Sequence, residues 1–215
     1  MRNEVLKMLL CRTSKVREKL IQEHDIKPIA HVRLLNGQKR QSCTKEVLTG
    51  SYYCFSYRAK NSDITGTFLC GTYAAEDFLE LIHHPKLKVF DPLVSENVGT
   101  RTSNGTNRDG GFNDTWHPTA KQLFNAINLI VICWGQVPGG VLQKIKNEIE
   151  KNKNREPLPR QIKAINTIIS RDRKDRTLQQ MLDDLRKNNN KIRDFHFNLL
   201  NESLVSSGIE KSYFE

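Results

Sequence analysis

The sequence predicts an α+β fold, in which a small antiparallel strand region with a hairpin-helix unit precedes a helical C-terminal half. Two β-rich runs, at residues 50–57 and 65–69, are joined by a turn-prone link and followed by a helical pattern over residues 74–82. From about residue 116 onward, apolar residues recur at helical rather than alternating spacing. The spacing of apolar residues thus changes from a strand pattern to a helix pattern, which is typical of folds whose strands and helices are separated along the chain.

The polar stretch 94–115 marks the expected boundary between the halves. It is rich in Gly, Asn, Thr and Ser, and loops of this length are usually functional or flexible. We therefore expect an α+β half over residues 1–93 and a helical half over residues 116–215. Arg101 and Arg108 in the loop are candidates for contacts with phosphate.

The N-terminal region predicts a basic amphipathic helix over residues 3–24, followed by a strand over residues 29–35. Pro28 is expected to close the helical region. Asn36–Gly37 is a strong tight-turn signal, so residues 38–41 are expected to return as a short partner strand.

The C-terminal half predicts a helical bundle around one buried helix. The pattern over residues 119–134 begins amphipathic and ends apolar on every side, which is typical of a buried helix. Shorter amphipathic elements with polar links are expected to pack against it. These are predicted at residues 141–152, 158–170, 177–187 and 195–204.

The chain of 215 residues is basic, with a net charge of +10, and the excess lies at its two ends. Residues 1–40 contain ten Lys and Arg against four Asp and Glu, and residues 141–200 contain fifteen against eight. Residues 41–140 are close to neutral. A polyanion is therefore expected to meet the flanking helices first. No apolar run approaches the roughly 18 residues that span a membrane, so no membrane partner is expected.

Five cysteines at scattered spacings, with no secretory leader pattern, predict reduced thiols in a cytoplasmic protein. The apolar run at residues 7–11 is interrupted by Arg12 too early to act as the apolar core of a leader.

Two of the cysteines lie at the ends of the hairpin-helix unit, in Cys43-Thr-Lys-Glu46 and Cys70-Gly-Thr-Tyr73. The order of turn, hairpin, cysteine and helix over residues 43–82 resembles a treble-clef zinc finger. The resemblance implies a local treble-clef-like fold with Cys43 and Cys70 as ligands of a structural zinc ion. The second ligand positions depart from the family pattern, because they hold Glu46 and Tyr73, and this puts the metal in question.

Other interpretations of these cysteines stay open. One alternative adds Cys54 of the hairpin as a third thiolate ligand beside Cys43 and Cys70, with His83 or His84 as the fourth. His83 lies roughly 20 Å along the helix from Cys70, which argues against one shared site. The alternative is that the cysteines are small core residues without a metal.

The predicted function is non-enzymatic nucleic-acid binding, to DNA or RNA, through basic helical surfaces. If the fold brings the first helix against the C-terminal helices, their excess charges merge into one positive surface. The hairpin row Tyr53, Phe55 and Tyr57 shares one strand face, which either stacks bases or belongs to the core. The candidate binding residues are Arg12, Lys15, Lys19, Arg101, Arg108, Lys144, Lys151, Lys153, Arg171, Arg173 and Lys174.

Two alternative functions remain, and whether the chain is an enzyme is left open. A metal-dependent nuclease or toxin of a defence system needs clustered carboxylates and often a lysine, for which Asp91, Asp172 and Lys174 are the candidates. A protein-interaction adaptor, whose basic faces only solubilise it, is the other. Motifs of serine hydrolases, zinc peptidases and dinucleotide-binding proteins are missing from the sequence.

Overall fold

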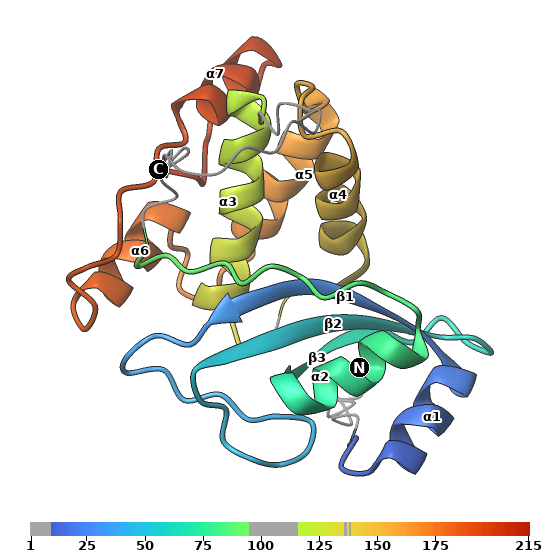
Figure 1. The fold of residues 1–215 in the computed structure, drawn as a ribbon. Helices are drawn as coiled ribbons and strands as arrows, with labels where there is room; N and C mark the ends of the chain where they lie inside the picture. Colours follow the sequence, from blue (N-terminus) through green and yellow to red (C-terminus); the bar gives the residue numbers. More distant parts are fainter. Residues whose placement is uncertain (1–9, 95–115, 136, 138) are drawn as a thin grey trace, which may run out of the picture.

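The computed structural model describes residues 10–94, 116–135, 137 and 139–215, and within these residues it contains seven helices and three strands (Figure 1). In chain order the elements are α1 (Ser14–Glu23), β1 (His24–Arg33), β2 (Ser51–Ala59), β3 (Thr65–Gly71), α2 (Thr72–Leu81), α3 (Pro118–Cys133), α4 (Gly139–Lys151), α5 (Pro159–Ile169), α6 (Leu178–Arg186) and α7 (Asn198–Ser206). The predicted α+β class is confirmed. None of the described helices is both long and apolar enough to cross a membrane.

β2 is the central strand of a three-stranded antiparallel sheet with the order β1-β2-β3. Because successive side chains of a strand point to opposite faces, Tyr52 and Cys54 join the core shared with the helical half. Tyr53, Phe55 and Tyr57 point the other way, into the core shared with α1 and α2. This aromatic row is buried, so it is core rather than a base-stacking surface.

β1 is an edge strand that contains Pro28, although the sequence predicts this residue at the end of a helix. A register shift between Pro28 and Ala30 interrupts the pairing with β2. Proline has no N–H to donate, and an edge strand with a bulge tolerates it. The tight turn at Asn36–Gly37 forms, but the hairpin expected with residues 38–41 was wrong, because β1 pairs with β2 instead.

The helical half is built around α3, as its apolar sequence predicted. Side chains on every side of α3 are buried, and α4, α5, α6 and α7 pack around it (Figure 1). The same core continues from these helices into β1 and β2. The two halves predicted from the sequence therefore share one hydrophobic core. Apart from Val94, the loop expected at residues 94–115 lies outside the described residues, as do the first residues of the helix expected at 3–24.

The carbonyl end of α3 is bonded to donors from the sheet half. The last carbonyl groups of a helix have no partner within the helix. Here the Tyr52 hydroxyl donates to the Val131 carbonyl at 3.3 Å, and the Gln38 amide donates to the Ile132 carbonyl at 2.8 Å. The Arg40 guanidinium donates to the carbonyls of Ile132 and Cys133, at 3.0 and 3.3 Å. A positive charge at this end also complements the helix dipole.

A disulfide joins Cys11 to Cys43, with their Cα atoms 5.4 Å apart. The prediction of five reduced thiols was therefore wrong for two of them. The fold brings these cysteines together, since the Cys11 N–H donates to the Cys43 carbonyl at 3.0 Å. Arg17 holds the same segment, donating to the Cys11 carbonyl at 2.7 Å and forming an ion pair with Asp77 on α2. The free cysteines are Cys54, Cys70 and Cys133.

We expect reduction of the Cys11–Cys43 disulfide to lower the free energy of unfolding by about 2–4 kcal/mol. The bond joins residues 32 positions apart, so breaking it frees a long loop in the unfolded chain. Urea unfolding with and without a thiol reductant measures the difference. The double variant Cys11→Ser, Cys43→Ser is the control and should be insensitive to reductant. Equal midpoints for the oxidised and reduced wild type would contradict the expectation.

Candidate functional site

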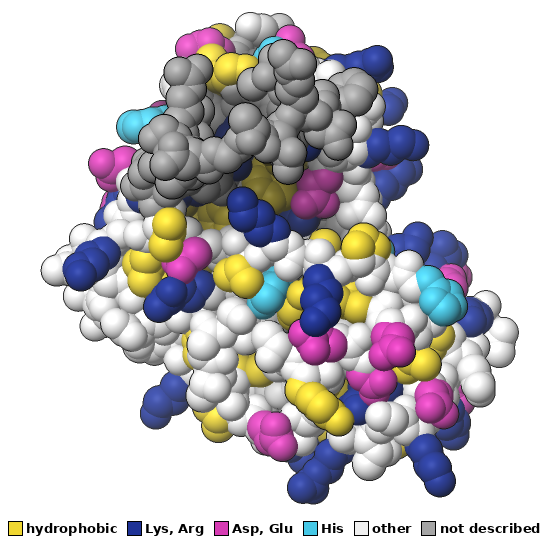
Figure 2. Space-filling model, viewed as in Figure 1, with side chains coloured by type: hydrophobic (Ala, Val, Ile, Leu, Met, Phe, Trp, Pro, Cys, Tyr) yellow, Lys and Arg dark blue, Asp and Glu magenta, His cyan; other side chains and the backbone are white. Residues whose placement is uncertain are grey.

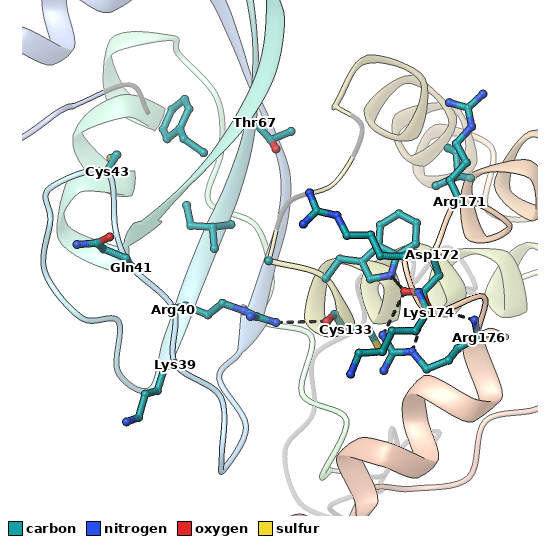
Figure 3. Close-up of a pocket in the computed structure, with 16 residues that line it drawn as sticks. Lys39, Arg40, Gln41, Cys43, Thr67, Cys133, Arg171, Asp172, Lys174 and Arg176 are labelled. Atoms are coloured by element: carbon teal, nitrogen blue, oxygen red, sulfur yellow. Dashed lines mark hydrogen bonds and ion pairs between the residues drawn. The ribbon is translucent and has the colours of Figure 1, made fainter. Parts of the chain in front are cut away.

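A pocket of about 690 Å³ lies where the sheet half meets the helical half (Figure 3). The sheet half contributes residues 39–41 and the middle of β3, whereas the helical half contributes residues 133–135 and the loop from α5 to α6. We call this hollow the junction pocket. Its basic lining residues are Lys39, Arg40, Arg171, Arg173, Lys174 and Arg176. Among the described residues its lining includes one acidic side chain, Asp172.

Asp172 belongs to this loop, and its side chain is buried and fully hydrogen-bonded. One of its oxygens, Oδ1, accepts from the Trp134 indole at 3.0 Å and from Arg176 Nη2 at 3.1 Å. The other, Oδ2, accepts from Arg176 Nε at 3.1 Å and from the backbone N–H groups of Lys174 and Arg176. Burial alone would raise the pKa of Asp172, but these hydrogen bonds lower it to about 2. The carboxylate therefore stays ionised and holds the loop in one conformation.

The α5–α6 loop presents three cations that the buried acid does not neutralise. Arg171, Arg173 and Lys174 are exposed, and none of them makes an ion pair with any residue that the structure describes. Arg176, in contrast, is bonded to Asp172 and also to Asp184 at 2.9 Å. The charge of Asp172 is thus matched by Arg176, and the three exposed cations outnumber the one exposed acid of the loop, Asp175.

The opposite wall of the pocket comes from the loop that follows β1. Arg40 points across the pocket toward the end of α3, where its guanidinium bonds the Ile132 and Cys133 carbonyls, while the Lys39 amine points outward (Figure 3). On β3, the Thr67 hydroxyl donates to the Val137 carbonyl at 3.0 Å and ties this wall to the segment after α3. Cations of both halves therefore border one hollow.

Trp134 lines the pocket on the helical side. α3 ends at Cys133, and Trp134 takes an extended conformation with φ −98° and ψ 141°, which directs the chain out of the helix. Its half-buried indole reaches the α5–α6 loop through the bond to Asp172. The apolar side chains of Leu69 and Ile168 also line the pocket.

The candidate binding residues predicted from the sequence are not all brought together. Arg171, Arg173 and Lys174 line the junction pocket, whereas Lys144 lines a smaller hollow of about 360 Å³ beside Arg160. Among the described residues, these two hollows have no lining residue in common. Lys151 ends α4 and Lys153 follows it. Arg101 and Arg108 lie outside the described residues.

Within the described residues the first helix packs away from the C-terminal helices, so the condition for one merged basic surface is not met. α1 packs against α2 and β1, on the opposite side of the sheet from α3–α7 (Figure 1). Arg12, Lys15 and Lys19 are exposed in that layer and do not line the junction pocket. Over this part of the molecule basic and acidic side chains are intermixed, as Figure 2 shows. The basic residues of the first helix therefore form no common surface with the α5–α6 loop.

Four of the lining residues were not predicted as site residues from the sequence: Lys39, Arg40, Trp134 and Arg176. The sequence places Lys39 and Arg40 in a partner strand and Trp134 at the end of a helix. The run from Arg171 to Arg176 contains four basic residues within six positions, so its charge density was a usable signal for Arg176. No sequence signal joins residues 39–40 to this run.

Zinc binding at Cys43 and Cys70 remains a prediction. The turn, the hairpin and the helix occur in the predicted order, and the Cys43 N–H donates to the Leu69 carbonyl at 2.7 Å beside Cys70. The sulfur of Cys43 is bonded to Cys11, and burial raises the pKa of the Cys70 thiol. No group of three or more potential metal ligands gathers within the described ranges.

The carboxylates considered for a nuclease are each engaged in an ion pair. Asp91 accepts from Arg33 Nη1 at 2.7 Å, and Asp172 is bonded to Arg176. Asp91 also accepts from the backbone N–H of Leu93, as expected of a turn. Both side chains therefore have structural roles in this fold.

Comparison with known protein families matched residues 11–211 to the family described as Uncharacterised conserved protein UCP028583. The match covers both halves of the chain and both walls of the junction pocket. No curated protein and no solved structure matched the chain.

Replacing Asp172 with Asn is expected to lower the free energy of unfolding by about 2 kcal/mol at neutral pH, since buried hydrogen bonds to a charged group are lost. The low pKa of Asp172 stabilises the fold above about pH 4, and this contribution is lost as the pH falls toward 2. The difference between wild type and variant should therefore shrink on acidification, as followed by urea unfolding between about pH 7 and pH 3.

Asp175→Asn is the matched control for this experiment. Asp175 is exposed on the same loop, and we expect its substitution to change the free energy of unfolding by less than about 0.5 kcal/mol. If Asp172→Asn unfolds like this control at every pH, the carboxylate does not hold the loop.

Proposed function

The chain belongs to the family described as Uncharacterised conserved protein UCP028583, and we propose that it binds nucleic acid, without catalysing a reaction, through phosphate contacts in the junction pocket. The observation that carries this proposal is the group of cations at one hollow. Arg171, Arg173 and Lys174 are exposed on the α5–α6 loop, and Lys39 and Arg40 come from the other half of the chain.

Because these cations border one pocket, their mutual repulsion raises the free energy of the protein without a bound anion. Like charges that border one hollow repel one another, and a pocket concentrates their field more than a flat surface does. The one acid in the described lining, Asp172, is matched by Arg176 and does not relieve the repulsion of the others. A bound anion would relieve it.

The arrangement favours an anion with several charges. The three loop cations follow one another along a short segment, and Arg40 faces them from a different element. A phosphodiester backbone offers negative charges at regular spacing, so several cations can be matched at once with release of counterions. Arginine is also the side chain that best forms paired hydrogen bonds to phosphate oxygens.

We expect the triple variant Arg171→Glu, Arg173→Glu, Lys174→Glu to bind a mixed-sequence oligonucleotide roughly hundredfold more weakly than wild type at 0.1 M salt. The loss should be similar for every sequence, because phosphate contacts carry no sequence information. The slope of log affinity against log salt should decrease by about 2 on a single strand and by nearly 3 on a duplex, as three phosphate contacts are lost. Fluorescence anisotropy over a salt series measures both quantities.

The control variant carries the same change of charge away from the pocket, as Lys27→Glu, Lys88→Glu, Lys191→Glu. These lysines are exposed, and none of them lines the junction pocket. This variant should keep most of the affinity. Equal weakening in both variants would mean that only net charge matters, and the pocket would lose its assigned role. If the wild type binds neither DNA nor RNA at low salt, the proposal is wrong.

A further inference from the structure

Trp134 gives the junction pocket a flat apolar wall beside its cations. The indole is half-buried and lines the pocket together with Leu69 and Ile168. Its N–H edge is held by Asp172 Oδ1 at 3.0 Å, and Asp172 is itself held by Arg176. The ring is therefore fixed in place before a ligand arrives, so little conformational entropy remains to be lost when a flat group packs on it.

A ligand that fits this pocket has a flat apolar part and a negative part. The cations Arg171, Arg173 and Lys174 belong to the same wall as Trp134, since Asp172 links the loop to the indole. Inorganic polyphosphate has the charge but no flat group, and an acidic peptide has no regular aromatic plane. A nucleotide unit has both parts, and aromatic side chains stack on every kind of base.

The volume of the pocket, about 690 Å³, lies in the range of sites that enclose one small ligand. The faces of a base inside a duplex are already stacked on their neighbours and are out of reach of a protein side chain. A base can therefore reach Trp134 only if it is unpaired. We infer that the junction pocket binds single-stranded nucleic acid, with one unpaired base packed on Trp134 and the adjacent phosphates on the α5–α6 loop.

This inference rests on the proposed function and limits its ligand to single-stranded nucleic acid. It requires a preference for single strands over duplex, which phosphate contacts alone do not produce. It also assigns a role to Trp134, which the charge of the loop does not require.

The experiment uses Trp134 as its own reporter. The chain has two tryptophans, and Trp116 packs on Phe124 with ring centroids 4.7 Å apart, outside the junction pocket. In the Trp116→Phe variant, Trp134 is the one remaining tryptophan and an aromatic ring is kept at position 116. This protein is titrated with four probes about 12 nucleotides long: single-stranded DNA, single-stranded RNA, a blunt DNA duplex, and a strand with abasic sites throughout.

We expect DNA and RNA single strands to quench the fluorescence of Trp134 and to bind roughly tenfold more tightly than the duplex. The abasic strand has the phosphates but no bases, so it should bind as weakly as the duplex and cause no quenching. A difference between the DNA and RNA strands would identify the natural ligand.

Two substitutions distinguish base stacking on Trp134 from the hydrogen bond by which its indole holds Asp172. Trp134→Leu removes the aromatic plane and should lower the single-strand affinity roughly tenfold, with the duplex affinity and the salt slope unchanged. Trp134→Phe keeps a plane but loses the N–H donor, and it should retain most of the affinity. If Trp134→Phe loses as much affinity as Trp134→Leu, the indole acts by holding Asp172 and the stacking inference is wrong.

Other results distinguish failure of the stacking inference from failure of the proposed nucleic-acid binding. Equal binding of single strand and duplex, with no change in Trp134 fluorescence, would overturn this inference. The proposed function would then survive, provided that the charge-reversal variant of the loop still weakens binding. No binding of any probe would overturn both. If Trp134→Leu does not fold, the quenching and abasic comparisons in the Trp116→Phe protein decide the question.

Discussion

The open carbonyl groups at the end of α3 determine how the two halves of the chain meet. Three donors from the sheet half satisfy them: Tyr52 on the central strand, and Gln38 and Arg40 on the loop that follows β1. A buried carbonyl without a partner would cost free energy, so these bonds set where the strand and the loop lie against the helix. The same contact brings the β1–β2 loop opposite the α5–α6 loop. The junction pocket therefore forms because the carbonyl end of α3 binds donors from the sheet half.

A buried carboxylate organises the basic side of this pocket. Removing Asp172 from water is unfavourable, but Arg176, Trp134 and the backbone N–H groups of the loop offset that cost. The acid also orders the cations around it, because two of its bonds come from the backbone of the loop. The arrangement of the cations therefore depends on the carboxylate of Asp172. Because its oxygens are already hydrogen-bonded within the protein, they are not available to a ligand. The exposed cations are free to meet phosphate, as we propose.

Part of the candidate site was predictable from charge density, and part was not. The run from Arg171 to Lys174 is basic enough to be selected from the sequence alone. Lys39 and Arg40 are basic too, but their meaning depends on a contact between residues more than ninety positions apart. For α1 the charge was misleading. From the sequence alone its basic residues are as good candidates as those of the α5–α6 loop, but they do not line the pocket. The sheet separates them, because Tyr53, Phe55 and Tyr57 of β2 pack toward α1 and α2 on one face, and Tyr52 and Cys54 pack toward α3 on the other.

Local periodicity was enough to locate the helices, the hairpin and the buried character of α3, because the spacing of apolar residues reports which face of an element is covered. The α+β class follows from that pattern. The partner of β1, the disulfide between Cys11 and Cys43 and the meeting of two basic loops follow from contacts between distant segments. Each of these depends on which groups lie opposite one another after the core has packed, such as the edge position that accepts Pro28 and the helix end that binds Arg40. Sequence spacing carries no record of such pairings, so only the tertiary structure decided them.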